Sequence, residues 1–155
     1  MSPILQAELR QRKPFSGLEH EAVLNLARTA AMLEHSTAET LKEHGLTPTQ
    51  YNALRILRGA GGEGLCRNEV RDRLVARVPD TTRLLDRLSE MGLVVREREG
   101  DDRRFVRTRI TRAGLELIQP LDEIMAALHR RQLGHLGRDK LRQLIRLLEE
   151  ARTAG

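Results

Sequence analysis

The stretch that decides the fold runs from Thr82 to Gly114 and reads TRLLDRLSEMGLVVREREGDDRRFVRTRITRAG. Its first part has helical spacing, with one apolar face made of Leu84, Leu85, Leu88 and Met91. Gly92 is a typical helix stop. Residues 94–110 then alternate in character around a Gly-Asp-Asp turn, which predicts a β-hairpin with a charged tip. A helix that leads directly into a hairpin is therefore the centre of the predicted fold.

Two longer helices are predicted upstream, and each begins at a capping-box pattern. Ser16 is followed three residues later by Glu19, and Thr47 is followed in the same way by Gln50. The first helix, over about residues 17–44, would be roughly 40 Å long at the usual rise per residue. A small domain cannot cover a helix of that length, so part of it should pack elsewhere.

The segment between these helices and the hairpin is predicted to hold two short helices. After the glycine-rich residues 59–64, Leu65 and Cys66 fit a short strand, and either Cys66 or Asn68 opens a brief helix. Val78-Pro79-Asp80 then breaks the pattern and starts the next helix, with the proline in its first turn. The order helix, helix, hairpin is typical of a winged helix-turn-helix.

Two further helices are predicted after the hairpin. Thr111 should cap the first of them, and Pro120 should bend it. The second follows a break at residues 133–137. Leucines and isoleucines recur on one face of each, and they would be exposed in a monomer.

Composition limits the possible functions. The chain of 155 residues carries a formal net charge of +5, and all but three of its basic residues are arginines. Arginine forks suit phosphates and guanine edges, although a GC-rich coding bias explains the same excess equally well. Aromatic residues make up only 2%, which argues against single-strand binding by base stacking.

Targeting and covalent signals are few. One cysteine excludes an internal disulfide and a multi-cysteine zinc site. The N-terminal residues lack the apolar core of a signal peptide, and no stretch approaches a membrane span, so a cytoplasmic location without membrane contact is predicted. The five histidines show no metal-binding spacing, so neither a metal nor a cofactor is predicted.

Residues 46–114 resemble the core of the MarR (multiple antibiotic resistance regulator) family, most specifically in TRLLDRLSEMGLVVRE, DDRR and ITRAG. The resemblance implies a mainly α fold with a small β-hairpin. This winged helix-turn-helix is flanked by N- and C-terminal dimerisation helices. The expected division is residues 16–45 for the first dimerisation helix, 46–112 for the DNA-binding core and 113–153 for the C-terminal dimerisation helices.

Three groups of residues are predicted to contact DNA. The predicted helix that starts at residues 78–80 contributes Pro79, Asp80, Thr82, Arg83, Asp86 and Arg87. The hairpin offers Arg98, Asp102, Arg103, Arg104 and Arg107. Contacts to the DNA backbone are predicted for Arg67, Thr47 and Thr49.

The roles within these groups differ. Arg83 should fork onto a guanine edge, and Thr82 should meet a thymine methyl group or a phosphate. The resemblance implies that Arg104 enters the minor groove while Asp102 braces the wing, because the family carries an Asp-x-Arg element there. For both elements the alternative is a solvated surface whose charges pair with each other.

The function predicted first is a repressor, not an enzyme. It would bind a pseudo-palindromic operator in double-stranded DNA as a homodimer, and a small molecule or another signal would release it. Two alternatives remain open at this point. A winged helix can serve as a protein-interaction module, and Cys66 can serve as the thiol of a redox-sensing regulator, although a small core residue is the simpler interpretation of this cysteine.

Overall fold

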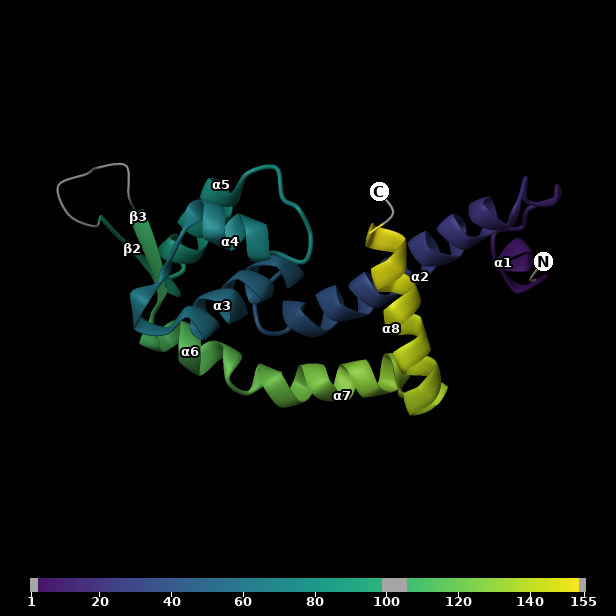
Figure 1. Cartoon of the computed structure of the whole chain (residues 1–155). Helices are drawn as coiled ribbons and strands as arrows, with labels where there is room; N and C mark the ends of the chain where they lie inside the picture. Colours follow the sequence, from purple (N-terminus) through teal and green to yellow (C-terminus); the bar gives the residue numbers. More distant parts are fainter. Residues whose placement is uncertain (1–2, 99–105, 154–155) are drawn as a thin grey trace.

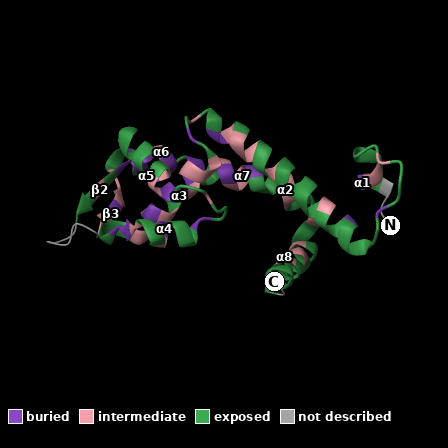
Figure 2. Cartoon of the chain, turned by 90° about the horizontal axis from the view of Figure 1, so that it is seen from above, coloured by how far each residue is buried: buried purple, intermediate pink, exposed green. Residues whose placement is uncertain are grey.

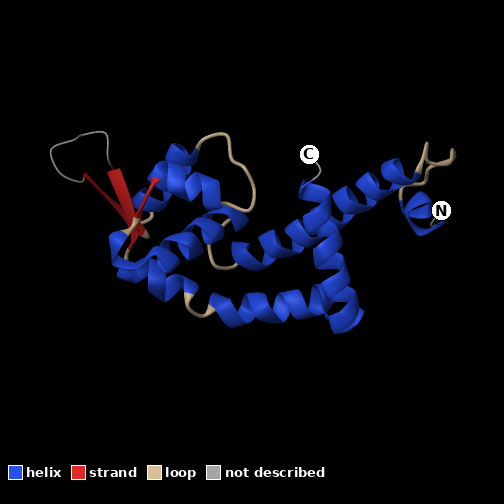
Figure 3. Cartoon of the chain, in the orientation of Figure 1, coloured by secondary structure: helices blue, strands red, loops and turns tan. Residues whose placement is uncertain are grey.

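The computed structural model describes residues 3–98 and 106–153, and it confirms a mainly helical chain with one small antiparallel sheet. Figure 3 shows this distribution of helix and strand. In chain order the elements are α1 (Pro3–Glu8), α2 (Leu18–Lys42), α3 (Pro48–Ala60), η1 (Gly61–Glu63), β1 (Leu65–Cys66), α4 (Arg67–Arg73), α5 (Thr81–Glu90), β2 (Val94–Arg98), β3 (Val106–Ile110), α6 (Arg112–Ile118), α7 (Leu121–Leu133), η2 (Gly134–Leu136) and α8 (Gly137–Thr153).

The chain is divided between a winged core and helical arms. Helices α3 to α6 and the strands gather at one end, while α2 and α7 run away from them (Figure 1). The Gln132 side chain of α7 donates a hydrogen bond of 3.3 Å to the Leu33 carbonyl of α2, so the two arms lie side by side. After η2, α8 continues in a new direction (Figure 1).

The predicted start of α3 is confirmed in detail. The Thr47 amide donates to Gln50 Oε1 at 3.0 Å, and the Gln50 amide donates to Thr47 Oγ1 at 3.2 Å. Pro48 occupies the first turn, where its missing N–H costs nothing. The turn before α3 and the orientation of this central helix therefore follow from local sequence.

The predicted capping box at Ser16 is wrong. Gly17 is the N-cap of α2, so Glu19 is the second helical residue and cannot complete a box with Ser16. Ser16 instead hydrogen-bonds through Oγ with the Nδ1 atom of His20 at 3.0 Å. Helix α1 is not predicted from the sequence at all, because six residues are too few to show a helical period.

The three strands pair in the order β1-β3-β2, with all pairs antiparallel. Arg96 of β2 and Leu65 of β1 both lie opposite Thr108 in the middle of β3. Gly64 approaches the same strand closely: it has φ 66°, and a Cβ there would lie 2.6 Å from the Thr108 carbonyl oxygen. Only glycine fits this approach, so β1 is held where the helix-turn-helix meets the hairpin.

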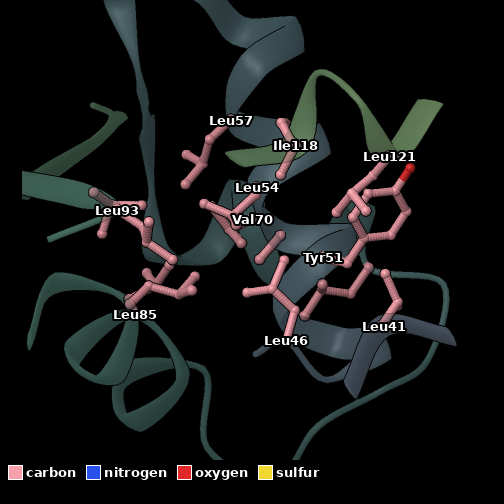
Figure 4. Close-up of a cluster of buried hydrophobic side chains, with 14 of the residues drawn as sticks. Leu41, Leu46, Tyr51, Leu54, Leu57, Val70, Leu85, Leu93, Ile118 and Leu121 are labelled. Carbon is pink, nitrogen blue, oxygen red and sulfur yellow. The ribbon is translucent and has the colours of Figure 1, made fainter. Parts of the chain in front are cut away.

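One continuous apolar core joins the winged core to the base of the arms (Figure 4). Leu54 and Leu57 of α3 are fully buried at its centre, and side chains from α4, α5, α6 and α7 surround them. The contributing residues of those helices include Val70, Leu85, Leu88, Ile118 and Leu121. Leu85 and Leu88 of α5 are fully buried, and both belong to the predicted apolar face of that helix.

The helix predicted to bend at Pro120 is in fact two helices. Helix α6 ends at Ile118 and α7 begins at Leu121, because proline removes one backbone donor and crowds the carbonyl four residues earlier. Leu115 of α6 is 40% exposed. The predicted Thr111 cap is confirmed, since its Oγ1 accepts a hydrogen bond from the Gly114 amide at 3.1 Å.

The arms carry apolar side chains that the described chain does not cover. Helix α8 has no buried residue among those described (Figure 2). Ile145 on this helix is 53% exposed. Helix α2 exposes four large apolar residues along its length, which are Leu18, Val23, Leu26 and Met32. Within the part of the chain that is described, no helix combines the length and the hydrophobicity needed to cross a membrane.

Two helical glycines should respond in opposite ways to a methyl group. A Cβ at Gly114 would lie 2.4 Å from the Leu93 carbonyl oxygen and 2.7 Å from Ile110 Cγ1, so Gly114→Ala should destabilise the fold by about 1–3 kcal/mol through overpacking. Gly59 has open space around it, so Gly59→Ala should stabilise by about 0.4–1 kcal/mol. Urea unfolding at one fixed protein concentration measures both, and equal effects would contradict the close contact at Gly114.

Candidate nucleic-acid interface

The outward side of α5 is fixed by its cap and by its buried leucines. Asp80 Oδ1 accepts a hydrogen bond of 3.0 Å from the Arg83 amide, which makes Asp80 the N-cap. Pro79 precedes this cap, so the expectation of a proline inside the first turn is wrong. With Leu85 and Leu88 buried, the opposite side of the helix presents Thr82, Arg83, Asp86 and Arg87, which are exposed or half-buried.

Arg67 and Thr82 come together at the start of this surface. Arg67, the first residue of α4, donates a hydrogen bond of 3.3 Å from Nη1 to Thr82 Oγ1 on α5. Arg83 is exposed, and among the described residues only its backbone appears in a hydrogen bond, the one to Asp80. A guanidinium and a hydroxyl thus lie at the exposed N-terminal turn of α5, with a second guanidinium beside them.

The other two candidates on α5 are paired within the protein. Asp86 forms an ion pair with Arg96 of β2, and Arg87 lies 3.2 Å from Glu90 on its own helix. Arg87 and Glu90 are both about two-thirds exposed, so water screens this pair and it contributes little to stability. Arg87 can therefore leave Glu90 for another anion at small cost.

The hairpin candidates are placed unevenly. Arg98 is exposed at the end of β2. Arg107 reaches back toward the helix-turn-helix, where its Nη1 donates to the Gly64 carbonyl at 3.2 Å and lies 3.9 Å from Glu69. Asp102, Arg103 and Arg104 lie outside the described residues.

Glu69 supports the start of α4 from within. Its carboxylate accepts a hydrogen bond of 2.8 Å from the Cys66 amide, and this bond together with nearby arginines lowers the pKa of Glu69. Cys66 is the N-cap of α4 and is half-buried, as the simpler interpretation of this cysteine expects.

The two threonine candidates lie at the start of α3. Thr47 uses its hydroxyl as the cap of that helix. Thr49 lines a hollow of about 250 Å³ between α2, α3 and the turn after α4, together with Glu34, Pro48, Asn52, Val75 and Ala76. Neither position is brought next to Thr82 or Arg83 by a hydrogen bond that the structure shows.

Sequence reasoning missed two arginines at the turn of the helix-turn-helix. Arg71 and Arg77 line a hollow of about 440 Å³ with Asp72, Leu74 and Val78. Arg77 is exposed three residues before the cap of α5. Its position immediately before the predicted helix start is the signal that would have identified it, because phosphate contacts commonly flank such a start.

A cleft lies between the winged core and α7. It has a volume of about 370 Å³ and is lined by Tyr51, Arg55, Arg58, Asp122, Met125, Ala126 and His129. Arg58 spans one side of it with two hydrogen bonds to Asp122, of 2.8 and 2.9 Å, and these bonds lower the pKa of the Asp122 carboxyl. The carboxyl group of Asp122 therefore stays charged at neutral pH and ties α7 to α3.

Tyr51 places an unusual polar group in the same cleft. Its hydroxyl oxygen is buried without a well-formed hydrogen bond among the described residues. Burial raises the pKa of Tyr51, so its hydroxyl keeps its proton and remains a donor. The Arg55 guanidinium lies over the ring, 5.9 Å from its centroid.

Comparison with known proteins agrees with this geometry. Residues 44–104 match the model of the MarR family. YkoM of Bacillus subtilis (strain 168), an uncharacterised HTH-type transcriptional regulator, is 32% identical over 145 residues, which cover 90% of this chain and 92% of YkoM. The HTH-type transcriptional repressor IacR of Pseudomonas putida is 27% identical over 124 residues, or 80% of this chain and 73% of IacR.

Solved structures lead to the same family. A MarR transcription factor from Planctomyces limnophilus is 43% identical, with a TM-score of 0.69 over 88% of this chain and 98% of that protein. NadR, solved in complex with 4-hydroxyphenylacetate, is 25% identical, with a TM-score of 0.68 over 90% of this chain and 97% of NadR.

The fold and the arginine-bearing helix define a class of protein, the winged helix-turn-helix transcription regulators that bind DNA. Within that class, the chain belongs to the MarR family.

Proposed function

We propose that this protein is a homodimeric repressor whose activity is binding rather than catalysis. It binds a pseudo-palindromic operator in double-stranded DNA and leaves it when a small molecule binds. The observation that carries the proposal is the exposed Arg83 on the first turn of α5, which follows Thr82, the residue that Arg67 hydrogen-bonds. A helix with this outward end suits a major groove, where an arginine fork distinguishes guanine from the other bases.

The remaining predicted contacts hold the protein on the duplex. Arg67, Arg98 and Arg107 supply positive charge for phosphates, and Thr47 and Thr49 supply hydroxyl donors at the start of α3. Pro79 and Asp80 set the start of α5, while Arg87 follows Arg83 one turn later. On the wing, Arg104 enters the minor groove, Asp102 braces the wing, and Arg103 also contacts the DNA. A narrow minor groove attracts arginine through its negative potential.

The arms supply the dimer interface in this proposal. Residues 16–45 and 113–153 form it, and residues 46–112 form the DNA-binding core. The exposed apolar residues of α2 and α8 support this division, because leaving such surface in water costs roughly 25 cal/mol per Å². A two-fold partner buries the same stripes on both chains at once.

Release by a small molecule is supported by the cleft between α3 and α7. A ligand there touches the winged core and an arm together, so its binding favours one angle between them. The buried Tyr51 hydroxyl offers a donor that the described protein groups leave without a well-formed bond. NadR binds 4-hydroxyphenylacetate, and IacR is a transcriptional repressor. We extend effector binding and repression from these relatives to this chain.

The dimer can be tested through α8. Light scattering at micromolar concentration should give about twice the chain mass of 17.6 kDa. Ile145→Glu should shift the protein toward monomer, because it places a charge within the proposed apolar interface. Gln143→Glu adds the same charge on the polar side of α8 and should leave the mass unchanged. A monomeric wild type would refute the two-fold arrangement.

Readout and positioning can be separated with two substitutions. Arg83→Ala should cost about 1–3 kcal/mol on the operator and much less on random DNA, because Arg83 contacts base edges. Arg104→Ala should weaken both DNAs more evenly and reduce the salt dependence by about one unit per chain. Fluorescence anisotropy at several salt concentrations measures both, on a duplex that the wild type selects from random sequences and on a scrambled duplex.

Arg130→Ala provides the control for these two variants. Arg130 is an exposed arginine on α7 that pairs with Glu123 at 2.8 Å, so its loss removes the same charge away from the proposed surface. It should bind both duplexes as the wild type does. If Arg83→Ala and Arg104→Ala behave alike, or if neither alters binding, α5 is not the reader, and a protein-interaction module becomes the better account.

A further inference from the structure

An acidic side chain on the outward face of α5 requires an explanation. Asp86 lies three residues after Arg83, so the two side chains share one side of the helix. A free carboxylate at that place would repel the phosphates of any DNA that Arg83 reaches. The carboxylate is not free, however, because it forms an ion pair with Arg96 of β2.

Arg96 belongs to the inner face of the hairpin. It lies directly opposite Thr108, and residues paired in this way point to the same side of a sheet. Thr108 is 1% exposed, so that side faces the core, and the Arg96 side chain is only 23% exposed. The guanidinium is therefore held against α5.

The opposite side of the hairpin is fastened as well. Arg109, whose neighbour across the strands is Val95, donates to the Gly62 carbonyl in η1 and pairs with Glu97. Only the Arg96–Asp86 pair joins the described part of the hairpin to α5 by an ion pair. This pair thus adds a side-chain link between β2 and the helix that carries Arg83, beyond the backbone hydrogen bond from the Leu93 amide to the Leu88 carbonyl.

We propose that Arg96 is a positioning residue for DNA recognition, which acts through Asp86 to set the angle between the wing hairpin and α5. The inference rests on the proposed function, because it assumes that α5 and the wing contact one duplex together. Residues 99–105 follow β2 directly in the chain, so the direction of β2 decides whether α5 and the wing can contact their grooves at the same time. The ion pair also neutralises Asp86, which is the one acidic residue among the proposed DNA contacts on α5 that lie beyond its first turn.

The test relies on the direction of the change in DNA affinity, because simple electrostatics and the positioning role predict opposite directions. Asp86→Asn removes a negative charge from the proposed DNA surface, so a merely repulsive Asp86 predicts tighter binding. The positioning role predicts the opposite, a loss of about tenfold on the selected duplex with little change on the scrambled duplex. Arg96→Gln should show the same loss with an unchanged salt dependence, because no phosphate contact disappears.

The double variant Asp86→Asn/Arg96→Gln completes the cycle. It should bind no more weakly than either single variant, because each one already breaks the pair. Thermal melting checks that the variants fold. Arg96→Lys, which keeps the charge but loses the fork, should fall between wild type and Arg96→Gln and replaces it if Arg96→Gln unfolds.

Each other outcome overturns the proposal. Tighter or unchanged binding by Asp86→Asn would show that the pair does not position the wing. An equal loss on both duplexes with a reduced salt slope for Arg96→Gln would make Arg96 a phosphate contact. Additive losses in the double variant would make the two residues independent. Failure of the wild type to bind any duplex would instead refute the proposed function itself.

Discussion

The burial of one face of α3 is the constraint on which the rest of the structure depends. Leu54 and Leu57 are fully buried there, and helices from both the winged core and the arms pack around them. The same helix contacts α2, α4 and α6, and its Arg58 is hydrogen-bonded to Asp122 of α7, so it links the helix-turn-helix to the arms. Truncation of such a leucine to alanine typically costs about 2–5 kcal/mol, a large part of a domain's stability.

Arginines are used in two distinct ways on this scaffold. Arg96 and Arg109 are paired within the protein, where they fasten the hairpin to α5 and to η1. Arg83 and Arg98 are exposed and available to phosphates or base edges. The net charge of +5 is therefore a poor guide to the local attraction for DNA, because a paired guanidinium attracts DNA less than a solvated one does. Arg58 is likewise paired within the protein, where its bond to Asp122 joins the core to α7.

Local signals in the sequence predict much of this fold, but not the contacts between distant segments. The cap at Thr47, the hairpin and the end of α5 near Gly92 follow from neighbouring residues and are confirmed. The pairs Arg96–Asp86 and Arg58–Asp122 could not be predicted, because a charge pattern does not reveal which partner the tertiary fold brings near. Ser16 failed as a cap because two candidate caps adjoin, and Gly17 took the position. The roles of Asp102 and Arg104 stay predictions.

Methylation interference on the selected duplex tests the central claim most directly, because it reports contacts at guanine N7 in the major groove. The account predicts two clusters of interfering guanines whose centres lie about 10 bp apart, one for the α5 of each subunit. It also predicts that Arg83→Ala abolishes the interference at the guanine that Arg83 contacts in each cluster, while interference at the other guanines of both clusters persists. A single cluster, or interference confined to minor-groove positions, would contradict a dimer that reads DNA through α5.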